Sequence, residues 1–273
     1  MAAEGRSSLM LVGAGKMGSA LLEGWLKDAG LDCDIHVIEP APGPRLKALA
    51  ESGRIVLAPD PSGAGEPELT VLAIKPQLMN EVLPGLKPLA DGGSAVLSIA
   101  AGTSIGTITS VLGTETPVVR AMPNTPAAIG MGFTVLTANE HAGEAQRKLA
   151  SRLMGAVGET AWIEDETLMD AVTAVSGSGP AYVFLLAEAM AAAGAELGLE
   201  PELAERMARA TVAGAGGLLH QDEAPASELR ERVTSPGGTT AAALDILMAD
   251  DGMRPLIARA LRAARDRGRD LGG

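Results

Sequence analysis

The sequence predicts an α/β domain with a mostly parallel, doubly wound sheet, followed by an all-α domain. Short apolar runs alternate with amphipathic stretches as far as Trp162, a pattern typical of a parallel sheet covered by helices on both faces. From about Asp165 onward only helical patterns remain. The length of 273 residues is enough for two ordinary domains. We therefore expect a first domain over residues 1–163 and a second over residues 164–273.

Six short runs of aliphatic and β-branched residues are predicted to be strands. They cover residues 8–12, 34–38, 69–74, 94–99, 118–121 and 133–136. Amphipathic stretches predict helices between these strands, at residues 16–28 and 44–51. In the second domain, helices are predicted over residues 165–175, 180–197, 201–220 and 254–269. Pro180 and Pro201 suit the first turn of a helix, where the missing N–H costs no hydrogen bond.

The composition argues against several classes of partner. A net charge of −12 and a pI of about 4.8 repel the phosphates of nucleic acids and anionic lipids, so we expect neither partner. Cys33 is the single cysteine and cannot build a disulfide within the chain or a structural zinc site; no metal is expected. The start of the chain has no apolar run like a signal peptide, and the most apolar stretch carries Glu188 and Glu196. We expect a cytoplasmic protein.

The first chemical signal is the motif Gly13-Ala14-Gly15-Lys16-Met17-Gly18. It follows a predicted strand and opens a predicted helix, which is the context of a dinucleotide-binding Rossmann fingerprint. Gly13 permits the tight turn, Gly15 lets the backbone approach a pyrophosphate, and Gly18 allows close packing of helix on strand. The free N–H groups of the helix N-terminus favour the phosphates. All six residues are assigned to a nicotinamide dinucleotide site.

The adenosine end of that site leaves two alternatives open. Glu39 stands at the end of the second predicted strand, where an acid commonly binds the ribose hydroxyls of NAD. Arg45 follows nearby and would instead suit the 2′-phosphate of NADP. The sequence therefore does not choose between NADPH and NADH.

Further loops follow the predicted strand ends, where doubly wound sheets bind ligands. The small side chains at residues 100–102 leave room for a planar nicotinamide against the backbone, and the Asn124 amide can donate a hydrogen bond to cofactor or substrate. The cofactor residues predicted in these loops are Ala73, Ile74, Lys75, Pro76, Ala100, Ala101, Gly102, Met122 and Asn124.

The helical domain adds two motifs rich in hydroxyls and glycine, residues 175–184 and 234–240. Each precedes a probable helix start, where N–H groups and hydroxyls can hold a carboxylate. Plain capping by Ser178 and Thr239 is the alternative, and it explains one hydroxyl in each motif but not the whole run. Ser176 and Gly238 are assigned to the substrate site with these motifs.

These motifs occur in the order found in pyrroline-5-carboxylate reductases, and the chain resembles that family over about residues 10–261. The matching segments are Gly13 to Gly18, Lys75-Pro76, residues 98–102, residues 120–126, residues 176–184 and residues 234–240. The resemblance implies the last step of proline biosynthesis, in which NAD(P)H delivers hydride to the imine carbon of 1-pyrroline-5-carboxylate and L-proline is formed. The substrate is thus a small cyclic imine carboxylate. NADPH is the reductant that the family implies, with NADH left open by Glu39.

The resemblance also implies an assembly and a substrate site. The helical domain would be a dimerisation domain that forms a homodimer, often built into a ring of dimers. The substrate carboxylate would lie around Ser235, Thr239 and Thr240, and Met122 and Asn124 would lie near the nicotinamide. Glu223 matches an acid found in some members of the family.

Imine reduction places no negative charge on oxygen, so the protein's main tasks are positioning and water exclusion. Thr240 is the candidate catalytic residue, to contact the ring nitrogen or relay a proton. Its unperturbed hydroxyl is a poor general acid, which leaves solvent as the alternative proton donor. A β-hydroxyacid dehydrogenase is the enzymatic alternative, but that family uses a lysine in its second domain and no lysine follows Lys148. A non-catalytic dinucleotide sensor would not need the motif at residues 234–240. The six-membered homologue of the substrate also stays open.

Overall fold

The computed structural model describes residues 7–28, 30–61 and 65–272. Its contacts divide the chain into two units. The first comprises Met1–Gly177 together with Arg265–Gly273, and the second comprises Ser178–Ala264. The domain boundary expected after residue 163 stays a prediction, since the contacts group the segment up to Gly177 and the end of the last helix with the first unit.

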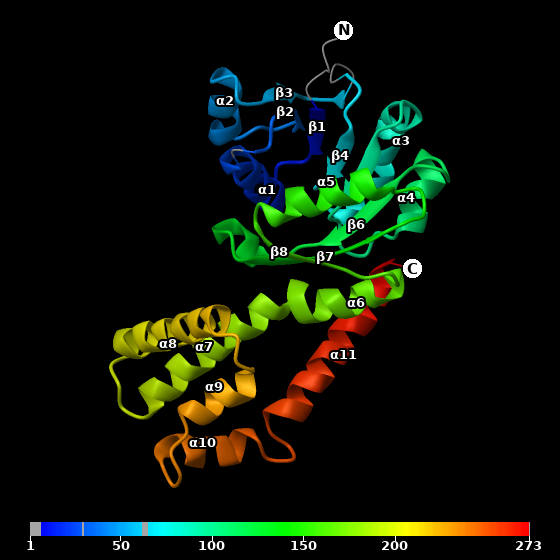
Figure 1. Ribbon diagram of the computed structural model, residues 1–273. Coiled ribbons are helices and arrows are strands. Elements are labelled where there is room, and N and C mark those ends of the chain that lie inside the picture. The colour runs from blue at the N-terminus through cyan, green and yellow to red at the C-terminus, as the bar shows by residue number, and fades with distance from the viewer. Residues whose placement is uncertain (1–6, 29, 62–64, 273) are drawn as a thin grey trace. The chain divides into compact units, whose positions relative to one another are not determined.

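The first unit is built on an eight-stranded sheet with the order β3-β2-β1-β4-β5-β6-β7-β8 (Figure 1). All neighbouring strands are parallel except β6 and β7, which pair antiparallel. The mostly parallel Rossmann sheet predicted from the sequence is therefore confirmed. The strands are β1 (Ser7–Val12), β2 (Cys33–Ile38), β3 (Val56–Ala58), β4 (Leu69–Leu72), β5 (Ala95–Ser98), β6 (Val118–Met122), β7 (Gly132–Ala138) and β8 (Gly158–Trp162).

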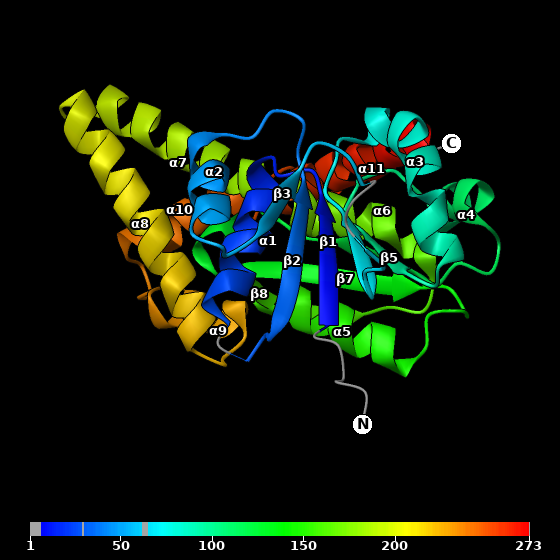
Figure 2. The same ribbon diagram turned by 90° about the horizontal axis from the view of Figure 1, so that it is seen from above.

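Successive residues of each central strand pack into two separate hydrophobic clusters, one on each face of the sheet, because side chains alternate across a sheet. Leu9 and Leu11 of β1 pack with α1 (Lys16–Lys27), α2 (Pro44–Glu51) and α5 (Glu144–Gly155). Met10 and Val12 pack with α3 (Met79–Asp91) and α4 (Ile105–Leu112) on the other face (Figure 2). Both faces are covered, which explains why these strands are apolar throughout.

A single buried hydrogen bond ties two helices of the first face together. The indole Nε1 of Trp25 on α1 donates to the carbonyl oxygen of Leu153 on α5 at 2.8 Å. Trp25 is 1% exposed, so this bond satisfies an indole N–H that has no access to water. The helix that follows the glycine motif is thereby anchored at its far end.

The second unit is entirely helical among the residues described. It contains α7 (Gly179–Glu196), α8 (Pro201–Gln221), α9 (Ala226–Arg232), α10 (Thr239–Leu247) and most of α11 (Met253–Gly272). Pro180 and Pro201 lie in first turns as predicted. In the part of the chain that the structure describes, no helix is both long enough and apolar enough to cross a membrane.

The structure corrects several sequence-based elements. Strands β3 and β8 and helices α3, α4, α5 and α9 were not predicted. Strand β3 is only three residues long, and α3 holds Pro84 and Pro88 inside it, which obscures a helical pattern. The helix predicted at residues 165–175 is broken into the 3₁₀ turn Glu166–Leu168, α6 (Met169–Val172) and the π-helix Thr173–Gly177.

Candidate active site

The candidate site lies where the strand order reverses between β1 and β4. Val12 of β1 pairs with Leu72 of β4 and with Ile38 of β2, so the loops that follow these three strands leave the same edge of the sheet. This edge is the usual ligand site of doubly wound sheets. The glycine motif, Glu39 and residues 73–76 are thus brought together, as the sequence predicted.

The glycine turn is shaped by close contacts that exclude side chains. Gly13 has φ +89°, a left-handed conformation that favours glycine, and a Cβ there would lie 2.8 Å from the carbonyl oxygen of Ala73. Gly18 is buried, and a Cβ on it would collide with the carbonyl oxygen of Gly13. A Cβ on Gly15 would meet no described atom within 4 Å. Two of the glycines are thus required by the protein itself, whereas Gly15 faces open space.

That open space fits a pyrophosphate. Gly15 is the N-cap of α1 and has no side chain to satisfy the first N–H groups. The first turn carries no acidic residue, so no side chain of α1 itself offsets the positive end of the helix dipole. Lys16 and Met17 are the first residues of α1, and Lys16 is exposed. The turn therefore has the free donors and the room that a dinucleotide requires.

Glu39 reaches back to the glycine turn. Its Oε2 accepts a hydrogen bond from the backbone N–H of Ala14 at 3.0 Å, and its Oε1 accepts one from the N–H of Ala41 at 3.1 Å. Its own N–H donates to the carbonyl oxygen of Ala58 on β3 at 3.2 Å. The carboxylate is therefore fixed beside the place where the adenosine ribose of a dinucleotide lies in this fold.

Arg45, the alternative partner for a 2′-phosphate, is already paired. Its Nε donates to Oε1 of Glu23 at 2.6 Å and its Nη2 donates to Oε2 of the same residue at 3.0 Å. The hydrogen bond from the Arg45 guanidinium holds the pKa of the Glu23 carboxyl below its ordinary value. The pair joins α2 to α1 and occupies the fork of the guanidinium.

The remaining cofactor candidates line the ends of β4 and β5. Ala73 and Ile74 lie close to Gly13, since a Cβ there would lie 2.8 Å from the Ala73 carbonyl oxygen and 2.8 Å from Cγ2 of Ile74, whereas Lys75 and Pro76 are exposed. After β5, Ala100 is buried and its N–H donates to Oγ of Ser98 at 3.3 Å, Ala101 is exposed, and Gly102 has φ +72°. The small side chains predicted to face a nicotinamide do stand at a strand end.

Asn124 is held by both ends of its side-chain amide. Its Oδ1 accepts from the N–H of Phe133 at 2.9 Å, and its Nδ2 donates to Oγ of Ser176 at 3.1 Å. Ser176 lies in the π-helix, and a Cβ on the next residue, Gly177, would collide with Cε of Met122. Single π-helical turns often occur at functional sites. The structure thus brings two cofactor candidates, Met122 and Asn124, together with one substrate candidate, Ser176.

A partly buried ion pair supports the loop after β5 and was not predicted. Arg120 of β6 is 7% exposed, and its Nη1 donates to Oε1 of Glu166 at 2.8 Å. The same oxygen accepts from the N–H of Ile105 at the start of α4 at 2.9 Å. A buried arginine in a strand needs a carboxylate partner, so Arg120 itself was a signal that such a partner exists. Glu166 fixes the far end of the Ala100–Gly102 loop.

We expect Glu166→Gln to lower the free energy of unfolding by about 1 kcal/mol, because a charge-assisted hydrogen bond to a buried guanidinium becomes a neutral one. Chemical denaturation measures the change. Glu164→Gln is the matched control, since that side chain is 88% exposed and approaches Arg147 only to 4.0 Å. An equal loss in both variants would show that the pair of Arg120 and Glu166 does not stabilise the fold.

The predicted carboxylate clamp of the second unit forms a turn that leads into α10. Gly237 has φ +68°, the N–H of Gly238 donates to the carbonyl oxygen of Ser235 at 3.0 Å, and a Cβ on Gly238 would collide with Oγ of Ser235. Gly238 is the N-cap, so Thr239 and Thr240 are the first two residues of the helix. Capping by Thr239, and by Ser178 at the start of α7, is not observed.

The hydroxyls of this turn are therefore not used to cap the helix. Within the residues described, the hydroxyls of Thr239 and Thr240 make no side-chain hydrogen bond, Ser235 and Thr239 are exposed, and Thr240 is half-buried. Glu223 is exposed between α8 and α9. Its neighbour Asp222 accepts hydrogen bonds from the N–H of Ala224 and from Arg232, which hold that segment in place.

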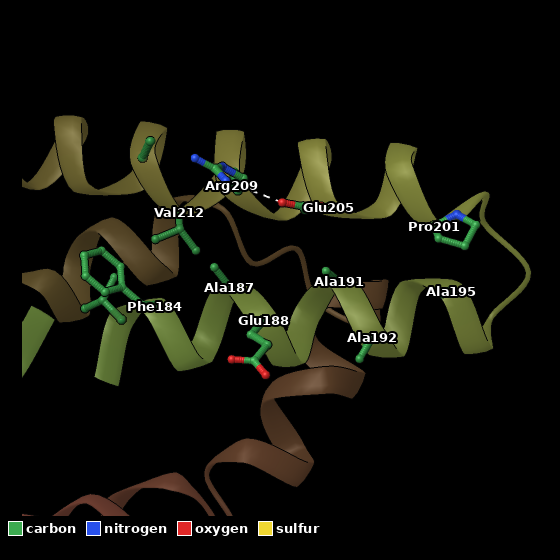
Figure 3. A pocket seen from close by; sticks show the side chains of 12 residues that line it. Phe184, Ala187, Glu188, Ala191, Ala192, Ala195, Pro201, Glu205, Arg209 and Val212 are labelled. Atoms are coloured by element: carbon green, nitrogen blue, oxygen red, sulfur yellow. Dashed lines mark hydrogen bonds and ion pairs between the residues drawn. The ribbon is translucent and has the colours of Figure 1, made fainter. Parts of the chain in front are cut away.

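A groove of about 810 Å³ runs between α7 and α8, and five of its twelve lining residues are alanines (Figure 3). In the described chain none of the 18 residues of α7 is buried, and Phe184 and Leu185 are 67% and 62% exposed. A monomeric protein rarely leaves such an apolar helix uncovered. The exposed face is typical of a subunit interface.

Comparisons with known proteins agree with this geometry. Residues 166–271 match the family described as pyrroline-5-carboxylate reductase dimerisation, and residues 8–102 match the family described as NADP oxidoreductase, coenzyme F420-dependent. A pyrroline-5-carboxylate reductase of Pseudomonas aeruginosa is 40% identical over 263 residues, which is 96% of each chain. The chain belongs to the pyrroline-5-carboxylate reductase family.

Other pyrroline-5-carboxylate reductases are similar over the full length. That of Synechocystis is 37% identical over 97% of this chain and 98% of its own. The structure of the Coxiella burnetii pyrroline-5-carboxylate reductase superposes with a TM-score of 0.90 at 34% identity, covering 98% of this chain and all of that one. The Plasmodium falciparum enzyme, solved with NADP bound, superposes with a TM-score of 0.82 at 27% identity, covering 99% of each chain. The predicted family is confirmed, and the helical part carries the dimerisation domain of a homo-oligomer.

Proposed function

We propose that this chain is a pyrroline-5-carboxylate reductase that uses NAD(P)H to convert 1-pyrroline-5-carboxylate into L-proline. The observation that carries the proposal is the 40% identity with a reductase of that name over 96% of both chains. The geometry supplies a chemical basis, because the glycine turn offers free donors and open space for a pyrophosphate.

Residues of the first unit would hold the dinucleotide. Gly13, Ala14, Gly15, Lys16, Met17 and Gly18 would bind the pyrophosphate at the start of α1, and Glu39 would face the ribose. When bound, the dinucleotide supplies a hydride from its nicotinamide ring. The loops that would orient that ring contain Ala73, Ile74, Lys75, Pro76, Ala100, Ala101, Gly102, Met122 and Asn124.

The second unit would hold the substrate carboxylate. Ser235 and Gly238 shape the turn, and Thr239 and Thr240 present hydroxyls and N–H groups at the start of α10. We assign Thr240 the contact to the ring nitrogen, and Glu223 and Ser176 supporting contacts to substrate. A protonated imine is already a strong electrophile, so these residues need only position it and exclude water.

The activity of a β-hydroxyacid dehydrogenase is disfavoured because the second domain lacks a suitable acid–base residue. That chemistry requires an acid–base group beside a hydroxyl or carbonyl, yet no lysine follows Lys148 in the sequence. His220, the last histidine in the chain, lies in the final turn of α8, which fits a structural role at a helix end.

We propose a homodimer formed through the helical domain, with rings of dimers as the larger assembly. The uncovered apolar face of α7 supports this proposal. We also propose a domain boundary after residue 163 and a cytoplasmic location, the latter supported by an acidic chain with a single cysteine.

Cofactor-oxidation kinetics test the proposed reaction. Purified protein is mixed with 1-pyrroline-5-carboxylate and either NADPH or NADH, and loss of absorbance of the reduced nicotinamide is followed. We expect turnover that depends on both the imine and the protein. Controls with 2-hydroxy and 3-hydroxy acids in the oxidative direction should be inactive. Turnover of those acids, or dinucleotide binding without reduction of any cyclic imine, would reject the proposal.

A further inference from the structure

The contacts of Glu39 point to its role in choosing between the two nicotinamide cofactors. NADP differs from NAD only by a phosphate on the 2′-oxygen of the adenosine ribose, so the choice is made by whatever faces that oxygen. In this fold the ribose lies beside the end of β2. Glu39 directly follows β2, and Ile38 pairs with Val12 just before the glycine turn.

The Glu39 carboxylate is held by two backbone contacts, and the Glu39 main chain by a third. The carboxylate oxygens accept from the N–H groups of Ala14 and Ala41, and the backbone N–H of Glu39 donates to the carbonyl oxygen of Ala58. An ionised carboxylate has about four acceptor positions, so each oxygen retains one for a ribose hydroxyl. Hydroxyl groups can donate to it, whereas a phosphate dianion has no proton to donate and is repelled by a negative charge held at this place.

The guanidinium group that could offset this repulsion is already paired with another carboxylate. Recognition of a 2′-phosphate uses an arginine in the loop or helix after β2, and Arg45 is the residue available there. Both its Nε and its Nη2 donate to Glu23. Among the described residues no lysine or arginine forms an ion pair with Glu39.

We propose that Glu39 is the cofactor-specificity residue of this chain and that the protein binds NADH more tightly than NADPH. The carboxylate accepts hydrogen bonds from the 2′- and 3′-hydroxyls of NADH and repels the 2′-phosphate of NADPH. This inference rests on the proposed dinucleotide site but not on the identity of the imine substrate.

Direct binding tests the proposal without turnover. Titrations of the full-length protein with NADH and with NADPH, followed by the nicotinamide fluorescence, give a Kd for each. We expect the Kd of NADPH to exceed that of NADH by about 30-fold, which corresponds to about 2 kcal/mol. Equal affinities, or tighter binding of NADPH, would overturn the proposal. Failure to bind either dinucleotide would instead reject the proposed function, so the two failures are distinguishable.

Two variants test whether Glu39 determines the ratio of the Kd values for NADPH and NADH. Glu39→Gln removes the charge but retains an oxygen that can accept from Ala14, so the Kd ratio should fall at least tenfold, mainly through tighter NADPH binding. Glu51→Gln makes the same change of charge at the exposed end of α2 and should leave the ratio within about twofold of the wild type. Should Glu39→Gln fold poorly, Glu39→Ser is the second variant, and the wild-type ratio remains decisive. An unchanged ratio in folded Glu39 variants would show that another residue makes the choice.

Discussion

Gly15→Ala is expected to weaken dinucleotide binding by about 30-fold or more while leaving the melting temperature within about 2 °C of the wild type. A Cβ on Gly15 meets no described atom within 4 Å, and its φ of −64° suits any residue. The substitution therefore costs the free protein little. The new methyl group would project into the space that a pyrophosphate needs in order to reach the N-terminus of α1.

Gly18→Ala is the matched comparison in the same turn. Its Cβ would collide with the carbonyl oxygen of Gly13 and lie 3.1 Å from Cβ of Ala73, so this variant should lose stability as well as affinity. Thermal melts of both variants, together with fluorescence titrations of NADH and NADPH, separate the two effects. If Gly15→Ala binds both dinucleotides like the wild type, the pyrophosphate does not lie over this turn.

The success of sequence-based prediction at this turn has a local cause. A strand, a tight turn and a helix follow one another within residues 7–27, and glycine spacing reports the backbone geometry directly. The strand ends at Ile38, Leu72 and Ser98 were predicted to within two residues, because parallel strands buried on both faces form nearly continuous apolar runs. The sequence alone therefore predicted that residues far apart in the chain lie at one edge of the sheet, although the pairing of the strands was not known.

Tertiary contacts of individual side chains could not be predicted from the local sequence. Nothing local shows that Glu39 reaches Ala14, that Arg45 pairs with Glu23, or that Glu166 pairs with Arg120. Each contact depends on how two elements pack, and several carboxylates are equally near in sequence. Strand β8 was missed because none of its residues is fully buried, so its pattern lacks the apolar run of a central strand.

The predicted cofactor site and the predicted substrate site also differ in how far they depend on tertiary contacts. Contacts within the first unit bring Met122, Asn124 and Ser176 together, although Ser176 had been grouped with the substrate motifs. In the second unit the turn from Ser235 to Thr240 is compact and local, so sequence spacing was sufficient to find it.

Thr240→Ala is expected to lower kcat/KM for 1-pyrroline-5-carboxylate by about tenfold or more, the scale of one lost transition-state contact. Loss of stability should not obscure the result. Thr240 lies in the first turn of α10, its hydroxyl makes no side-chain hydrogen bond with other described residues, and alanine is the better helix former. Thr240→Ser, which keeps the hydroxyl, should recover most of the rate.

Thr239→Ala distinguishes positioning of the ring nitrogen from binding of the carboxylate. Thr239 is the preceding residue of the same turn and is exposed, and we assign it to the carboxylate alone. Its loss should raise KM with little change in kcat, since binding to the carboxylate is the same in ground state and transition state. Thr240→Ala should instead lower kcat, because a bond to the ring nitrogen gains strength as the imine is reduced. If Thr240→Ala retains wild-type kcat in a folded protein, the proton comes from solvent and Thr240 has no part in the chemical step.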